Sequence, residues 1–180
     1  MDPKRIVMDK EEMARAIKRM AREIIEKARG AKDLAFIGIQ TRGVYLAQRL
    51  AKEIVKAEKG KIPIGILDIT LYRDDLTNIA RQPVVKETDI PFDITDKRVV
   101  LIDDVLFAGR TIRAALDAII DFGRPKSIQL AVLIDRGHRE LPIQADFVGK
   151  STTTTLAEEV LVRMEEADDI DQVMLIGKEG

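Results

Sequence analysis

Hydrophobic and polar positions alternate along the chain in two periods, one helical and one typical of buried strands. Over residues 9–29 the apolar side chains recur every three to four positions, which predicts an amphipathic helix. Asp9 is placed to cap its start and Gly30 to end it. The next run, residues 34–39, is continuously apolar, the pattern of a strand that is buried on both faces.

The same two periods predict the elements that follow. Helices are expected over 44–57 and 111–122, strands over 62–71, 99–103 and 127–135, a long loop or hairpin over 72–92, and short strands over 146–149, 159–164 and 172–176. Alternating strands and helices favour right-handed βαβ units, so the fold class is α/β with a mainly parallel central sheet flanked by helices. The strand-rich tail departs from this alternation, and we expect it to form a small subdomain beside the strand ends.

Composition excludes several classes of protein. The 180 residues suit one domain, and 46% hydrophobic with 34% charged residues is typical of a soluble globular protein. Without cysteine there is no disulfide, thiolate zinc site or cysteine nucleophile, and a single histidine disfavours a His-rich metal site. Thirty basic against 31 acidic residues argue against coating nucleic acid by bulk charge. A polar start and the lack of a long apolar run predict a cytoplasmic protein with no membrane partner.

The segment from Val99 to Thr111 carries the most specific chemistry. A buried strand delivers Asp103 and Asp104 to its end, a loop containing Gly109 follows, and a helix begins near Thr111. Ligands of open α/β sheets lie at the carboxyl ends of strands, and loop amides with a helix N-terminus bind phosphate well. Two carboxylates beside a phosphate repel it unless ribose hydroxyls or hydrated Mg²⁺ lie between them. The segment therefore predicts a ligand with a phosphate and a sugar diol, together with Mg²⁺; a purely structural acidic pair and glycine turn is the alternative.

The same segment resembles the phosphoribosyl pyrophosphate (PRPP) signature of type I phosphoribosyltransferases, in its apolar run, its acidic pair and its Gly-Arg-Thr ending. It departs at Ala108, where that family usually has Thr. Gly38–Gly43 is similar to the family's pyrophosphate loop, with Gln40 where relatives often have a basic residue, and Leu71–Leu76 is similar to its flexible catalytic loop. The resemblance implies one domain over 1–180, with a core over about 9–135 and a strand-rich hood formed by the tail, about 136–180, with the N-terminal segment.

The resemblance also implies site residues. Asp103 and Asp104 would hold the ribose hydroxyls, directly or through the water shell of Mg²⁺. Thr41 and Arg42 would bind the pyrophosphate, and Tyr72 and Arg73 would close over it, although an ordinary surface loop at these two residues stays open as an alternative. The 5′-phosphate would be held by Val105, Leu106, Phe107, Ala108, Gly109, Arg110 and Thr111. The base pocket would come from Ile134, Asp135, Arg136 and Val160.

Three further blocks narrow the resemblance to one subfamily. Asp68–Leu76, Arg113–Ala118 and Gln129–Ile143 resemble the bifunctional regulators that attenuate pyrimidine operons and act as uracil phosphoribosyltransferases, and the similarity runs from about Val7 to about Ile176. The implied reaction is uracil plus PRPP giving UMP and pyrophosphate, which needs positioning of reactants and no Cys or His nucleophile. The second implied function is binding of leader mRNA, strengthened by UMP or UTP, to promote transcription termination. A homodimer or higher homo-oligomer is also implied.

Basic side chains on the first predicted helix are the candidates for RNA contact. They are Arg15, Lys18, Arg19, Arg22, Lys27 and Arg29, and Arg136, Arg139 and Lys150 would extend the patch if the fold brings them close. Ordinary solvation of a charged helix face is the alternative, and Glu23 and Glu26 interrupt the stripe. His138 is interpreted either as a hydrogen-bonded turn residue or as an RNA or subunit contact.

Three other functions remain open at this point. One is a phosphoribosyltransferase for another base, a purine or orotate, without RNA binding. Another is an RNA-binding regulator with little catalysis. A third is a nucleotide binder without transfer chemistry, which is disfavoured because no G-x-G-x-x-G follows the first core strand. Gln144, where close relatives often have Arg, and the segment 151–155, where they usually have Asn-Ile-Pro-Thr-Ser, are departures that bear on RNA affinity and on the pocket rim.

Overall fold

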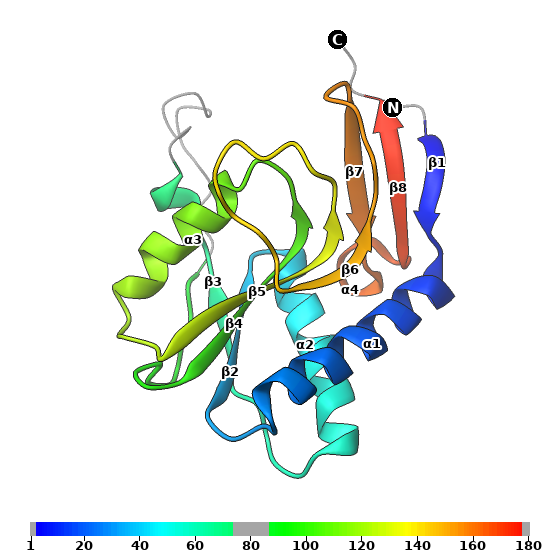
Figure 1. Cartoon of the computed structure of the whole chain (residues 1–180). Coiled ribbons are helices and arrows are strands. Elements are labelled where there is room, and N and C mark those ends of the chain that lie inside the picture. The colour runs from blue at the N-terminus through cyan, green and yellow to red at the C-terminus, as the bar shows by residue number, and fades with distance from the viewer. Residues whose placement is uncertain (1–2, 74–86, 178–180) are drawn as a thin grey trace.

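The computed structural model describes residues 3–73 and 87–177 and contains a larger parallel sheet and a smaller antiparallel sheet (Figure 1). The elements in chain order are β1 Pro3–Met8, α1 Lys10–Ala28, β2 Leu34–Ile39, α2 Arg42–Ala57, β3 Ile64–Leu67, the 3-10 turn η1 Thr70–Tyr72, β4 Arg98–Leu106, α3 Arg110–Ile120, β5 Ser127–Asp135, β6 Phe147–Ser151, β7 Glu158–Arg163, α4 Glu165–Asp168 and β8 Gln172–Gly177. The α/β class and the parallel sheet predicted from the sequence are confirmed.

The larger sheet has the strand order β3-β2-β4-β5-β6, and all its pairings are parallel. Every residue of β2 is buried, and so are five consecutive residues of β4, which explains their continuous apolar runs. Because the strands are parallel, their carboxyl ends meet at one edge, where the loops after β2, β4, β5 and β6 lie together.

Helices cover the two faces of this sheet unequally. Helices α1 and α2 pack over one face, and α3 packs on the other with the apolar side chains of β4 and β5 (Figure 1).

Asp9 caps α1 through a capping box: its carboxylate accepts from the Glu12 amide at 2.8 Å, and the Glu12 carboxylate accepts from the Asp9 amide at 2.9 Å. The predicted helix boundaries at Asp9 and Gly30 are therefore confirmed to within one or two residues.

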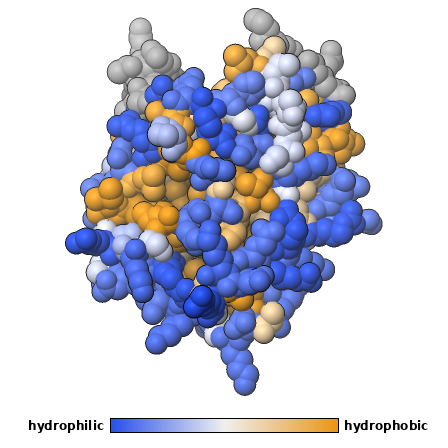
Figure 2. Space-filling model, viewed as in Figure 1, coloured by the Kyte–Doolittle hydropathy of each residue, from blue (hydrophilic) through white to orange (hydrophobic). Residues whose placement is uncertain are grey.

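The face covered by α3 leaves apolar surface open. Figure 2 shows apolar side chains gathered over α3 and the neighbouring part of the sheet. Partly buried side chains there include Leu116, Ile128, Ile143 and Val148, and Ile120 is 68% exposed. Within residues 3–73 and 87–177, no helix has both the length and the apolar character needed to cross a membrane.

The smaller sheet, the hood, has the order β1-β8-β7 and is antiparallel throughout. It joins the first strand of the chain to the last two, so the N- and C-terminal ends lie close together (Figure 1). The first of the three short strands in the tail, β6, does not join the hood. Instead, β6 pairs with β5 at the edge of the larger sheet. Residues 147–151 therefore belong structurally with the core.

Three of the differences from the predicted boundaries bear on the site. Helix α2 begins at Arg42 rather than Val44, because the turn after β2 leads directly into the helix. Strand β3 ends at Leu67, and a 3-10 turn replaces the rest of the expected strand. Strand β4 continues to Leu106, since its pairing with β5 extends through Asp103 to the pair Leu106–Asp135. The acidic pair thus lies within β4, near its carboxyl end, and not in the loop after it.

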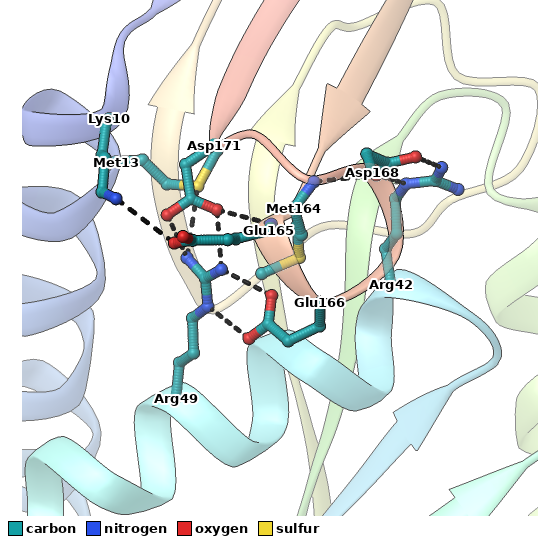
Figure 3. A network of polar contacts seen from close by, with 9 residues as sticks. All are labelled: Lys10, Met13, Arg42, Arg49, Met164, Glu165, Glu166, Asp168 and Asp171. Atoms are coloured by element: carbon teal, nitrogen blue, oxygen red, sulfur yellow. Dashed lines mark hydrogen bonds and ion pairs between the residues drawn. The ribbon is translucent and has the colours of Figure 1, made fainter.

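Salt bridges dock the hood segment 164–171 onto α2 (Figure 3). The Arg49 guanidinium donates to Glu166 at 2.6 and 2.8 Å and to Asp171 at 2.7 and 3.0 Å. Its pair with Glu166 lowers the pKa of that carboxyl. Burial alone would raise the pKa of Asp171, but the hydrogen bonds from Arg49 and from the Glu165 amide bring it below its ordinary value.

We expect Arg49→Gln to lower the free energy of unfolding at pH 7 by about 2 kcal/mol, because it leaves two partly buried carboxylates without their cation. Lowered carboxyl pKa values stabilise the fold above the unfolded pKa of about 4, and that stabilisation is lost as pH falls through the folded pKa. The difference between wild type and variant in urea denaturation should therefore shrink as the pH falls below about 4. Lys56→Gln, which breaks the exposed Lys56–Glu53 pair, is the control; a loss as large as that of Arg49→Gln would contradict the docking role.

Candidate active site

The acidic pair stands at the carboxyl end of β4. Asp103 is only 7% exposed and Asp104, on the other side of the pleat, is half-buried. Burial raises the pKa of Asp103 well above its ordinary value, and the negative charge of Asp104 raises it further. Two adjacent carboxylates in this setting resist full ionisation. The site is thus suited to a cation or to hydroxyl donors that satisfy both side chains.

Glycines bring the first turn of α2 against β4. A Cβ on Gly43 would lie 2.5 Å from the carbonyl oxygen of Ile102, the residue before the acidic pair. A Cβ on Gly38 would lie 2.6 Å from the Cα of Val44. Only residues without a side chain allow this approach. The predicted pyrophosphate loop, whose Gln40–Thr41 peptide is cis, therefore lies beside Asp103 and Asp104.

Arg42 is a cation whose charge interacts with this pair. Its Nε and Nη2 atoms donate to the two carboxylate oxygens of Asp168, in the hood, at 3.1 and 2.7 Å. This hydrogen-bonded pair raises the pKa of Arg42 above its ordinary value despite partial burial, and the charge of Asp104 adds to the effect. Arg42 and Asp104 are thus electrostatically coupled, as two residues that bind neighbouring parts of one ligand would be.

The loop after β4 leads into an uncapped helix. Gly109 is the N-cap of α3, with φ of +93°, and supplies no side chain to bond the first-turn amides. The first N–H groups of a helix have no intrahelical partner, and Gly109 gives the first turn of α3 no side-chain cap, so this end of the helix favours an anion. The Ala108 carbonyl accepts from the amides of Glu140 and Leu141, which fastens this loop to the segment after β5. The predicted phosphate loop, 105–111, therefore leads into a helix N-terminus without a side-chain cap, and its binding of phosphate stays a prediction.

A cavity of about 460 Å³ opens between the ends of β5 and β6. Asp135 and Arg136, both predicted at the base pocket, line it together with Gly137, His138 and residues 151–154. Ile134 and Val160, the other two predicted base contacts, are fully or almost fully buried in the core. The structure therefore does not bring their side chains to this cavity.

Arg136 braces the cavity from inside. It is 5% exposed, its Nε donates to the Thr154 hydroxyl at 3.1 Å, and its Nη2 donates to the Thr155 carbonyl at 2.9 Å. Its guanidinium lies 4.2 Å from the centre of the Phe107 ring. Burial lowers the pKa of Arg136. The Arg136 side chain thus connects Phe107, in the loop after β4, with Thr154 and Thr155. We call residues 151–155 the threonine segment.

The threonine segment is also fixed by its other neighbours. His138 Nε2 lies 2.6 Å from the Thr154 carbonyl oxygen, in agreement with the interpretation of a hydrogen-bonded turn histidine. Arg5 in β1 donates to the Thr152 hydroxyl at 3.2 Å. These hydrogen bonds hold the loop without a proline.

The expected catalytic loop is only partly described. The Tyr72 hydroxyl donates to Asp121 at 2.5 Å, at the end of α3, so in this conformation Tyr72 is turned away from the acidic pair. The same bond raises the pKa of Tyr72. Arg73 is exposed at the end of the described segment, and residues 74–76 of the predicted loop lie outside the described residues.

Six of the candidate RNA contacts lie on α1 or on β6, which packs beside it. Arg15, Lys18 and Arg22 form an exposed row along α1. Arg19 lies beside this row and reaches across to the carbonyl oxygens of Val148 and Gly149 in β6. The others are Lys27, which pairs with Asp146, and Lys150, which donates to the Val7 carbonyl. We call these six residues the basic face.

Arg136 and Arg139 are not part of the basic face. Arg136 is buried as described, and Arg139 donates to Asp135 at 2.7 Å and to the carbonyls of Phe107 and Ile143. Their guanidinium groups serve the loops around the cavity, and the basic turn seen in the sequence is directed inward. We therefore leave both out of the RNA surface.

The site residues that sequence reasoning missed are mostly acidic. Asp168 pairs with Arg42, and Glu166 and Asp171 pair with Arg49. The signal was present in the sequence: two arginines about two turns apart on one helix match an acidic run at 165–171. Pairing across this separation required the fold.

In the described part of the chain, no group of three or more His, Cys, Asp or Glu side chains is arranged to hold a metal ion. The two oxygen donors of Asp103 and Asp104 nevertheless fit Mg²⁺, which commonly keeps several waters and takes its remaining ligands from substrate phosphates. The donor set thus agrees with a metal that arrives with its phosphate ligand.

The comparisons with known proteins agree with this geometry. Residues 6–166 match the model of the phosphoribosyl transferase domain family. The chain is 56% identical to the Bifunctional protein PyrR of Deinococcus radiodurans, over 98% of this chain and 97% of that protein. It is 58% identical to that of Thermus thermophilus, over 97% and 96%, and 51% identical to that of Bacillus velezensis, over 99% and 100%.

Solved structures show the same fold at low identity. A hypoxanthine phosphoribosyltransferase of Trypanosoma cruzi superposes with a TM-score of 0.76 at 18% identity, covering 97% of this chain and 95% of that one. One from Staphylococcus aureus gives 0.73 at 19% identity, covering 96% and 92%. The fold is thus that of a known domain, and the chain belongs to the phosphoribosyl transferase domain family and, within it, to the bifunctional PyrR proteins.

Proposed function

We propose that the protein is a uracil phosphoribosyltransferase that converts uracil and PRPP to UMP and pyrophosphate, and that it also regulates a pyrimidine operon by binding leader mRNA. The observation that carries the enzymatic part is the meeting of three features at one edge of the sheet. These are the buried pair Asp103–Asp104, the Arg42 loop held against it by Gly43, and the uncapped N-terminus of α3. PRPP carries three groups that match these features: a ribose diol for the acidic pair, a pyrophosphate for the Arg42 loop and a 5′-phosphate for the N-terminus of α3.

The residues act mainly by positioning and by electrostatics. The anomeric carbon becomes cation-like as the pyrophosphate leaves, so the protein must hold the sugar and stabilise the departing negative charge. Asp103 and Asp104 hold the ribose hydroxyls, and their negative charge favours the cation-like sugar. Arg42 and the amides near Thr41 bind the pyrophosphate, and the first-turn amides of α3 bind the 5′-phosphate. When bound, Mg²⁺ neutralises pyrophosphate charge.

The base is assigned from the resemblance to the pyrimidine regulators, and the cavity beside Asp135 supports it. The cavity is lined by Asp135, Gly137 and His138 and by the segment 151–154, and its volume suits a small planar base. Arg136 fixes those walls relative to Phe107, next to the phosphate loop. A base held there lies at the carboxyl edge of the sheet, on the same side as the acidic pair.

The RNA-binding part is supported by the basic face. Near-neutral total charge excludes indiscriminate binding, but Arg15, Lys18 and Arg22 form a row of exposed basic side chains along α1. Specific RNA recognition also needs shape and hydrogen bonding, which loops and bulges provide. UMP and UTP are the proposed effectors, and the homo-oligomer implied by the resemblance stays a prediction.

Turnover with PRPP and Mg²⁺ tests the enzymatic assignment. We expect UMP formation from uracil and none from hypoxanthine, guanine or orotate, each assayed alone by chromatographic product detection. Efficient use of a purine or of orotate without use of uracil would contradict the assignment.

The acidic pair should be essential for transfer and not for folding. We expect Asp103→Asn combined with Asp104→Asn to reduce kcat/KM for PRPP by more than about a hundredfold, since electrostatic stabilisation of the transition state is lost. The melting temperature should not fall, because the variant removes a buried charge repulsion. Asp117→Asn, on the exposed side of α3, is the matched control. Normal turnover by the double variant would refute the assigned role.

For RNA, Lys18→Glu combined with Arg22→Glu should weaken leader binding by about tenfold or more at fixed salt and reduce its salt dependence. These two side chains are exposed, whereas Arg19 also bonds β6 and would confound folding with binding. Lys126→Glu, at the start of β5 and away from α1, is the control. Binding is measured by filter retention with and without UMP. Unchanged affinity in the double variant would rule out this face.

A further inference from the structure

The contact between Arg42 and Asp168 joins the pyrophosphate loop to the hood across 126 residues of sequence (Figure 3). Both carboxylate oxygens are used, one by Nε at 3.1 Å and one by Nη2 at 2.7 Å. Nε and Nη2 lie along one side of the planar guanidinium group, which we call its side edge; Nη1 and Nη2 form its end edge. A paired, planar contact of this kind fixes the orientation of an arginine as well as its position.

The end edge of the same guanidinium is left for a ligand. Nη1 and the second hydrogen of Nη2 point along that edge, and within residues 3–73 and 87–177 no acceptor other than Asp168 is bonded to Arg42. The Arg42 side chain remains 30% exposed. Phosphate oxygens match the spacing of two parallel N–H donors. Asp168 and a phosphate would thus occupy different edges of one group.

Asp168 is itself held firmly. The Met164 amide donates to its Oδ2 at 2.8 Å, and the pair with Arg42 lowers the pKa of the carboxyl, so it is charged at neutral pH. The segment 164–171, which includes the short helix α4, is fastened to α2 by the ion pairs of Arg49 with Glu166 and Asp171. The hood therefore offers Arg42 a fixed anchor and not a mobile side chain.

We propose that Asp168 is a positioning residue for pyrophosphate binding: it holds the side edge of Arg42 so that the end edge faces the pyrophosphate group of PRPP. The proposal rests on the proposed function of the Arg42 loop and adds the hood carboxylate to it. Two alternative roles of the Arg42–Asp168 pair predict different effects on pyrophosphate binding. A competing Asp168 would weaken pyrophosphate binding, and a purely structural one would leave it unaffected.

Calorimetric titration of the full-length protein with pyrophosphate and MgCl₂ tests this without any base. We expect Asp168→Asn to raise the dissociation constant of pyrophosphate by about tenfold, because the free arginine must now be ordered on binding. In turnover assays the KM for PRPP should rise while the KM for uracil stays within about twofold. Glu166→Gln is the matched control, because it removes a hood carboxylate of the same network that contacts Arg49 and not Arg42.

A double-mutant cycle shows whether Asp168 acts through Arg42. Arg42→Lys removes the fork, and in that background Asp168→Asn should change the pyrophosphate dissociation constant by less than about twofold. Asp168→Glu keeps the charge, displaces it by one methylene and should give an intermediate loss, which serves if the Asn variant does not fold.

Three outcomes would overturn the proposal. Tighter pyrophosphate binding by Asp168→Asn would make Asp168 a competitor. An unchanged dissociation constant, or one shifted equally by Glu166→Gln, would make the pair structural. An undiminished effect in the Arg42→Lys background would show that Asp168 does not act through Arg42. Wild-type protein that binds pyrophosphate but does not convert uracil would contradict the proposed function and leave the role of Asp168 supported.

Discussion

The site depends on two like-charged carboxylates on consecutive residues of a buried strand. Asp103 has lost almost all contact with water, and Asp104 lies one residue away with the same charge. The raised pKa of Asp103 expresses the cost of this arrangement in the protein alone. Such strain persists only where the surrounding fold over-determines it, and such sites are commonly functional. The groups that would relieve it, a diol and a cation, are those that Mg²⁺ and PRPP supply together.

The rest of the site is arranged around that pair by backbone geometry. Gly43 lets α2 start against β4, which places Arg42 close enough to Asp104 for their charges to interact. Gly109 starts α3 without a side-chain cap. Arg42 and Arg49 then fasten the hood to α2, so the small sheet is bonded to the same helix that begins at the pyrophosphate loop. The helix that begins beside the acidic pair is thus also the helix that holds the hood.

Much of the fold was predictable from the sequence because its signals are local. The capping residue Asp9 fixed the start of α1, and the apolar run of β5 gave its bounds directly. The partner of β6 was not predictable, since a short strand carries no local mark of the sheet it joins. The same holds for side chains: Arg136 and Arg139 have the sequence appearance of a basic surface turn, and only the fold shows that carbonyls, Asp135 and Thr154 take up their donors.

The central claim is that this site transfers a phosphoribosyl group to uracil, and a competition assay tests it most directly. Equal concentrations of uracil, hypoxanthine, guanine and orotate are incubated with the protein, Mg²⁺ and limiting PRPP, and the nucleotide products are separated and quantified. The account predicts UMP as the dominant nucleotide, formed with an equal amount of pyrophosphate. A purine nucleotide or the orotate product in its place, or no consumption of PRPP, would contradict it.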